Sequence, residues 1–130
     1  MDQILVPVSP GELLDRITIL RIKSERIADT QQLANVRREL ALLEQTWRAE
    51  RLADAGLTAE EAALQRVNRE LWDIEDRIRE HEAQRRFDAA FIELARSVYQ
   101  RNDERAAIKK RINVRLNSTL VEEKSYQPYA

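Results

Sequence analysis

Apolar residues recur at three- and four-residue steps through four long stretches of the chain, as the buried side of an α-helix requires. The stretches that this pattern predicts as helices are residues 10–28, 31–54, 59–85 and 88–116. Their connections are short, so neighbouring helices should run antiparallel in an up-down-up-down arrangement. The predicted fold class is therefore all-α, a single antiparallel four-helix bundle over residues 1–130.

Extended segments are predicted at both ends of the chain. Residues 3–8 are mostly β-branched or apolar and include Pro7, which suits an extended arm. Residues 118–130 form a C-terminal tail. In the predicted topology the first helix starts where the fourth ends, so we expect the arm to pair with the tail. The first helix is apolar on two sides, which predicts a central position in the packing.

The helix starts carry capping signals. Ser9 should cap the first helix, with Pro10 as its first residue and Glu12 closing a capping box. Thr58 should open the third helix in the same way, and Asp88 should cap the fourth.

The fourth helix breaks the amphipathic rule in its second half. Asn102, Arg105, Lys109 and Asn113 fall on the midline of its apolar face. Each of these polar groups, if buried without a partner, would cost about 1–3 kcal/mol. Two interpretations follow: a structural network within the protein, or a ligand site for a small anion such as a sugar phosphate.

The charges of the last two helices favour the structural network. Residues 59–82 contain eight Asp or Glu against four Arg, whereas residues 96–115 contain seven Lys or Arg against two acidic residues. Helices of such opposite charge could pair with each other and fix their register. We therefore prefer the network and retain the ligand site as the alternative.

Trp72 is the second irregular position, because it lies off the apolar seam of the third helix. Asp76 and Arg79 follow it on the same side. A large aromatic residue there is either covered by the arm or tail, or serves as an interface anchor. The spacing of Trp72 and Asp76 would also suit a sugar platform with a hydrogen-bond acceptor beside it.

Composition excludes several classes of function. The net charge of −1 gives no global attraction to nucleic acid or anionic lipid. There is no cysteine, no catalytic Ser/His/Asp set and no glycine-rich phosphate loop, so we predict no catalytic residue and no cofactor.

His81 is the sole histidine, and we expect a partly buried side chain with no metal site. The apolar start, residues 4–8, is too short for a signal or membrane span, which favours the cytoplasm.

Several stretches together resemble a bacterial family of short proteins catalogued as domain of unknown function 6165. The stretches are residues 6–9, 11–23, 70–76, 91–113 and 120–126. The resemblance implies no activity and transfers no functional residue. It offers only a loose association with bacteria that make complex cell-surface polysaccharides.

We therefore expect a small non-enzymatic helical module that binds a partner protein or itself, as a homodimer in which the second and third helices contribute apolar surface. The alternative is a binder or enzyme for a small anionic ligand or sugar phosphate, using the midline of the fourth helix. Neither a membrane nor nucleic acid is an expected partner.

Overall fold

The computed structural model describes residues 1–129, and these residues form four α-helices and one short 3₁₀-helix without any strand. The elements are α1 (Pro10–Arg26), α2 (Thr30–Ala49), η1 (Leu52–Asp54), α3 (Thr58–Ala83) and α4 (Ala89–Arg115). The predicted all-α fold class is confirmed. Among these residues no helix is long and apolar enough to cross a membrane.

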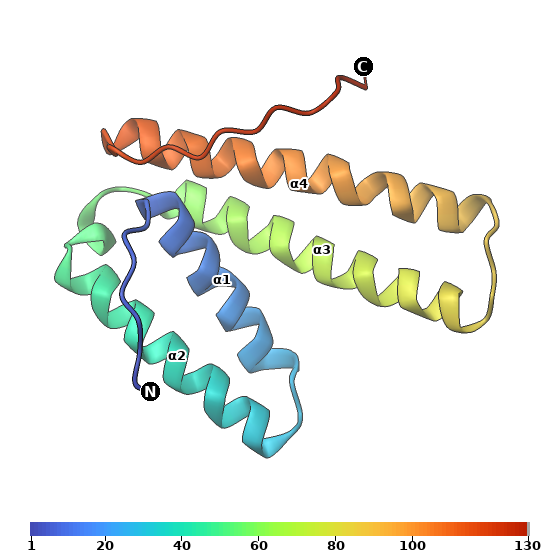
Figure 1. The fold of residues 1–130 in the computed structure, drawn as a ribbon, viewed down its shortest axis with the longest axis horizontal. Helices are drawn as coiled ribbons and strands as arrows, with labels where there is room; N and C mark the ends of the chain where they lie inside the picture. The colour runs from blue at the N-terminus through green and yellow to red at the C-terminus, as the bar shows by residue number, and fades with distance from the viewer. Residues whose placement is uncertain (130) are drawn as a thin grey trace.

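The helices form two antiparallel hairpins, α1–α2 and α3–α4, which meet at one end and diverge toward the other, as Figure 1 shows. α1 packs against each of the other three helices, which confirms its predicted central position. α2 packs mainly on α1, and α3 packs mainly on α4. The bundle is therefore closed at one end and open at the other.

The core lies at the closed end of the molecule. Its buried residues are Leu13, Leu14, Ile17, Trp47, Leu57, Leu64, Val67, Leu71, Ile108 and Ile112. They come from the start of α1, the end of α2, the start of α3 and the end of α4. Each fully buried aliphatic side chain contributes about 1.5–3 kcal/mol, so this cluster fixes how the two hairpins join.

The helix starts follow the sequence signals only in part. Ser9 Oγ accepts a 3.1 Å hydrogen bond from the Glu12 backbone N–H, and Pro10 is the first residue of α1, as predicted. The predicted capping box does not close, because the Glu12 carboxylate forms ion pairs with Arg16 and Lys109 instead. At α3 the predicted Thr58 cap is wrong: the capping position is Leu57, which is 3% exposed and part of the core. Burial of that apolar side chain sets the start of α3.

α2 ends five residues before the predicted boundary. After Ala49 the chain turns, and Arg51 has a left-handed backbone conformation with φ of 58°. The short η1 follows, and its Leu52 packs against the core. The apolar residues after Ala49 are thus buried by a turn and a 3₁₀ segment, which the helical pattern alone did not distinguish from further helix.

The predicted pairing of the arm with the tail is wrong. The arm crosses the α1–α2 hairpin, where it lies beside Leu13 and Leu42, whereas the tail runs back along α4 (Figure 1). Glu122 of the tail pairs with Lys109 of α4, and Tyr129 packs edge to face on Tyr99. These contacts with α4 direct the tail away from the arm.

Candidate functional site

The polar midline of α4 divides into two halves with different surroundings. Lys109, in the half nearer the core, is 8% exposed and lies among three carboxylates. Its Nζ is 2.7 Å from Glu12 Oε2, 2.7 Å from Glu122 Oε2 and 3.8 Å from Asp15 Oδ2. The protein itself therefore neutralises this ammonium group.

Burial disfavours the charged form of Lys109, but the hydrogen bonds to Glu12 and Glu122 outweigh it, so the pKa of Lys109 is raised. The same contacts act on the acids. Burial opposes ionisation of Glu12, yet Lys109 and Arg16 hold its pKa below the ordinary value. The hydrogen bond from Lys109 likewise lowers the pKa of Glu122. All three groups are thus stabilised in their charged forms at neutral pH.

Asn113 also has a structural role in this half of the midline. It is 1% exposed, and its Oδ1 accepts a 2.8 Å hydrogen bond from the Gly11 backbone N–H. That N–H belongs to the first turn of α1, where no intrahelical acceptor exists. The Nδ2 of Asn113 has no hydrogen-bond partner within residues 1–129. The side chain therefore fastens α1 to α4 through its oxygen alone.

Among the described residues, the partners of Arg105, in the outer half, are neutral amides. Its Nη1 donates to Asn68 Oδ1 at 3.3 Å, and its Nη2 donates to Asn102 Oδ1 at 2.9 Å. No carboxylate among residues 1–129 forms an ion pair with this half-buried guanidinium. The sequence-based hypothesis of a structural network thus describes Lys109 and Asn113, whereas Arg105 has no ion-pair partner in the part of the chain that the structure describes.

Asn68 connects the two halves of the midline. This residue of α3 is 5% exposed, and its Nδ2 donates to Asp15 Oδ1 and to Thr18 Oγ1, each at 2.9 Å. Its carbonyl oxygen is left to accept from Arg105. Because both ends of the amide are engaged, Asn68 fixes the position of the Arg105 guanidinium.

The expectation that acidic residues of α3 pair with the midline is wrong for Lys109. The carboxylates come from α1 (Glu12 and Asp15) and from the tail (Glu122), not from α3. The acidic residues of α3 do pair with α4, but at the edges of the contact, as in Arg101 with Glu70 at 3.3 Å and Arg115 with Glu60 at 3.0 Å.

These network partners had a sequence signal that could have been used. Asp15 and Thr18 stand among the apolar residues of the first helix, and Asn68 stands between Val67 and Leu71. Each is a polar residue on an otherwise apolar helix face, as are the midline residues of the fourth helix. Glu122 lies outside any helix, so periodicity gives no indication of its role.

Residues from both sets singled out from the sequence line one cleft between α1, α3 and α4, although Lys109 and Asn113 of the midline lie outside it. Trp72, Asp76 and Arg79 contribute from α3, and Asn102 and Arg105 contribute from α4. The remaining lining residues are Ile19, Ile22, Asn68, Leu71 and Glu75. The cleft has a volume of about 530 Å³ and lies where the hairpins begin to diverge. The structure thus brings together two features that the sequence left separate.

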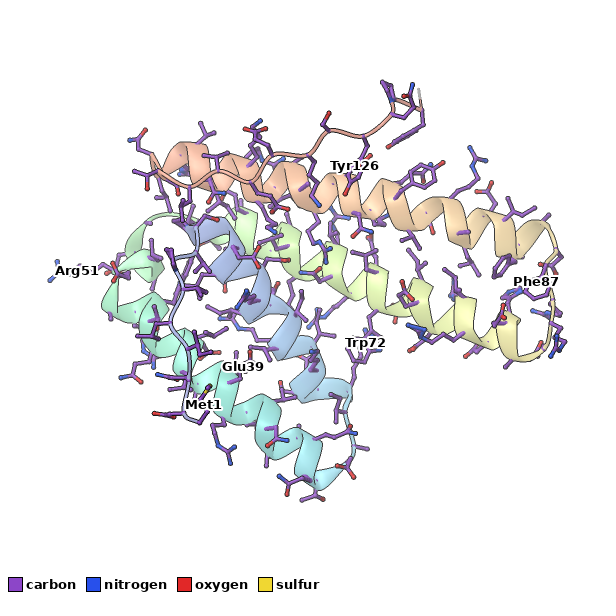
Figure 2. All side chains as sticks on the ribbon, in the orientation of Figure 1. Met1, Glu39, Arg51, Trp72, Phe87 and Tyr126 are labelled. Carbon is purple, nitrogen blue, oxygen red and sulfur yellow. The ribbon has the colours of Figure 1, made fainter. Side chains whose placement is uncertain are left out.

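Trp72 lies on the side of α3 that faces α1, as Figure 2 shows. Its ring is partly exposed, and the Arg26 guanidinium lies 5.9 Å from the ring centre. Arg26 is held there by Asp73, at 2.5 Å. α1 therefore supplies the side chain over the ring, in place of the arm or tail that formed one of the two alternatives for Trp72.

His81 lies far from this cleft, near the turn between α3 and α4. It is 8% exposed, and its Nδ1 is 3.2 Å from the Arg86 carbonyl oxygen, which agrees with the predicted partly buried histidine. Within residues 1–129 no group of three or more potential ligands is placed to hold a metal ion.

Comparison with protein families identifies one match. The model of a family of unknown function (DUF6165) matches residues 4–129, so the chain belongs to this family, and the resemblance noted in the sequence is confirmed. No curated protein and no solved structure matches the chain.

Proposed function

We propose that this member of the DUF6165 family is a non-enzymatic helical module that associates with a second copy of itself through its N-terminal arm. The observation that carries the proposal is the exposure of the arm's apolar side chains. Ile4 is 74% exposed, Leu5 84% and Val6 62%. Contiguous exposed apolar surface of this kind is typical of an interaction site.

The backbone of the arm supports the same proposal. Residues 1–8 are extended and take part in no backbone hydrogen bond within residues 1–129. An extended segment with free N–H and C=O groups can add as a strand to a matching segment. The β-branched and apolar side chains of the arm favour such pairing.

A second copy of the arm is the partner that fits best. Two identical segments related by a twofold axis pair antiparallel, and the same surface serves both partners. The arm and α2 line one groove, to which α2 contributes Leu42, which is 45% exposed, together with Arg38 and Glu39 of opposite charge. A surface with an apolar centre and both signs of charge at its edge is suited to contact its own copy.

The contribution of the helices to the proposed dimer differs from the sequence-based expectation. α2 offers Leu42 beside the arm, but the seam residues Leu64, Val67 and Leu71 of α3 are buried within their own chain. We therefore place the dimer contact on the arm and α2. The link to cell-surface polysaccharides stays a prediction, because the description of the family names no activity.

Light scattering of the purified chain tests the proposal. We expect twice the monomer mass of 15.2 kDa at tens of micromolar protein. Val6→Asp should give the monomer, since a carboxylate would enter the apolar contact. Val114→Asp is the matched control, because Val114 is 61% exposed on α4, outside the arm surface. A monomeric parent, or equal dissociation by both variants, would overturn the proposal.

A further inference from the structure

We infer that the cleft between α1, α3 and α4 binds a monosaccharide that carries a single anionic group, either a phosphate or a carboxylate. The cleft is separate from the N-terminal arm, so the test of this inference does not depend on the proposed dimer. It is carried by the arrangement of Arg105, Trp72 and Asp76 around the cleft.

Arg105 provides the site for the anion. A guanidinium has five N–H donors, and the hydrogen bonds to Asn68 and Asn102 engage two of them. The other donors remain for a ligand, in the planar geometry that suits a carboxylate or phosphate. Because Asn68 is fixed by Asp15 and Thr18, the guanidinium is oriented before any ligand arrives.

The contrast with Lys109 shows why the anion would bind at Arg105. Both cations lie on the midline of α4, one helical turn apart. Three carboxylates surround Lys109, whereas Arg105 has only amide partners within residues 1–129. A small anion would neutralise Arg105, as the carboxylates of the protein neutralise Lys109.

Trp72 provides the surface for the sugar ring. It follows Asn68 by one turn of α3, and its ring lines the same cleft. An indole ring has two flat apolar faces, so the Arg26 guanidinium over one face leaves the other for the C–H groups of a pyranose. Ile19, Ile22 and Leu71 continue this apolar floor.

Asp76, one turn beyond Trp72, provides the acceptor for sugar hydroxyls. It forms no ion pair within residues 1–129, whereas the neighbouring Glu75 is paired with Arg79 at 3.4 Å. The cleft is therefore positive near Arg105 and negative near Asp76. This polarity favours a ligand with one charged end and one hydroxyl-bearing end, and it disfavours a polyanion.

The size of the cleft agrees with such a ligand. Its volume of about 530 Å³ falls within the range of small-molecule sites, about 300–1,000 Å³. Along α3 the recognition elements span the two turns from Asn68 to Asp76, which correspond to roughly 12 Å of helix. One sugar ring with its anionic substituent fits that span.

Isothermal titration calorimetry with four probes tests the ligand class. We expect α-D-glucose 1-phosphate or galacturonate to bind, and glucose and inorganic phosphate to bind at least tenfold more weakly. The two anionic sugars distinguish a phosphate ligand from a carboxylate ligand. Equal binding of inorganic phosphate and the sugar phosphate, or no heat from either anionic sugar at millimolar concentration, would overturn the inference.

Variants of the full chain locate the site. Arg105→Gln should weaken binding of the preferred sugar at least tenfold, whereas Arg111→Gln, the same change on the exposed side of α4, should leave it unchanged. Asp76→Asn alters an exposed residue, so it tests the site even if Arg105→Gln does not fold. We expect Asp76→Asn to weaken sugar binding severalfold and to leave the binding of inorganic phosphate unchanged. Unchanged sugar affinity in Asp76→Asn, or in a folded Arg105→Gln protein, would contradict the assignment.

Discussion

The backbone N–H of Gly11 donates a 2.8 Å hydrogen bond to the side-chain oxygen of Asn113, across 102 positions of sequence. The contact is possible because Gly11 has no side chain. A Cβ at this position would lie 2.6 Å from the Lys109 carbonyl oxygen and 2.9 Å from Asn113 Oδ1. The first turn of α1 therefore approaches α4 as closely as the backbone allows.

Gly11→Ala should destabilise the protein although alanine favours helix formation. The added methyl group meets the backbone carbonyl oxygen of Lys109, which cannot move as a flexible side chain would, and the buried side chain of Asn113. We expect a loss of about 1–3 kcal/mol in the free energy of unfolding, the usual cost of overpacking. Urea denaturation measures it, with Glu25→Ala at an exposed position of α1 as the control. A Gly11→Ala protein as stable as the parent would show that α1 and α4 leave room for a methyl group at this position.

Lys109→Met should be destabilising as well, because Asp15 would remain buried without its cation. Glu12 and Glu122 reach solvent, so the cost should lie at the lower end of the range for a broken buried ion pair, about 3 kcal/mol. Lys110→Met, which breaks an exposed pair with Glu123, should change stability by less than about 1 kcal/mol. If the Lys109→Met protein melted above the parent, the ammonium group would be part of a ligand site.

The carboxylates around Lys109 should make stability depend on acid pH. Glu12 and Glu122 have pKa values lowered below the ordinary 4.5 in the folded protein. Their stabilising contribution is therefore present above pH 4.5 and is lost as the pH falls through the lower folded-state pKa values. Thermal melts from pH 7 downward should show this loss. At alkaline pH, Lys109 remains charged because its pKa is raised. Its contribution to stability is therefore lost only after the pH exceeds 10.5.

Glu122→Gln is the variant that tests the acid dependence. It removes one of the titrating groups, so the loss of stability below pH 4.5 should be smaller than in the parent. Glu123→Gln, next to it in the tail, is the control, since the ion-pair partner of Glu123 within residues 1–129 is the exposed Lys110. An identical pH profile for Glu122→Gln and the parent would mean that the Lys109–Glu122 pair does not form in solution.

Local features of this chain could be predicted from the sequence because they depend on neighbouring residues. The side-chain cap by Ser9 and the cap by Asp88 both form as expected. The midline of the fourth helix was recognisable because polar residues at helical spacing interrupt an apolar face. The same rule marks positions that need partners without identifying the partners.

The partners and the cleft could not be predicted because they depend on how the helices cross. Glu12 could have closed a local capping box, but in the fold Lys109 lies within reach, and a cation offers a stronger contact. Trp72 and Arg105 share one cleft only because α1 diverges from α3 and α4. Periodicity shows that a face is covered, and it does not give the angle at which the covering helix lies.

The divergence of the two hairpins also divides the molecule into parts of unequal local stability. Beyond the cleft, the outer half of the α3–α4 hairpin has no third helix against it (Figure 1), and Phe87 and Ile92 near its turn are each 54% exposed. Amide hydrogens there should exchange through local opening, whereas those of α1 should exchange only when the whole domain unfolds. Arg105 and Trp72 lie at the boundary between these two cooperative units. A molecule bound between them would slow amide exchange in the outer hairpin, far from any atom that it touches.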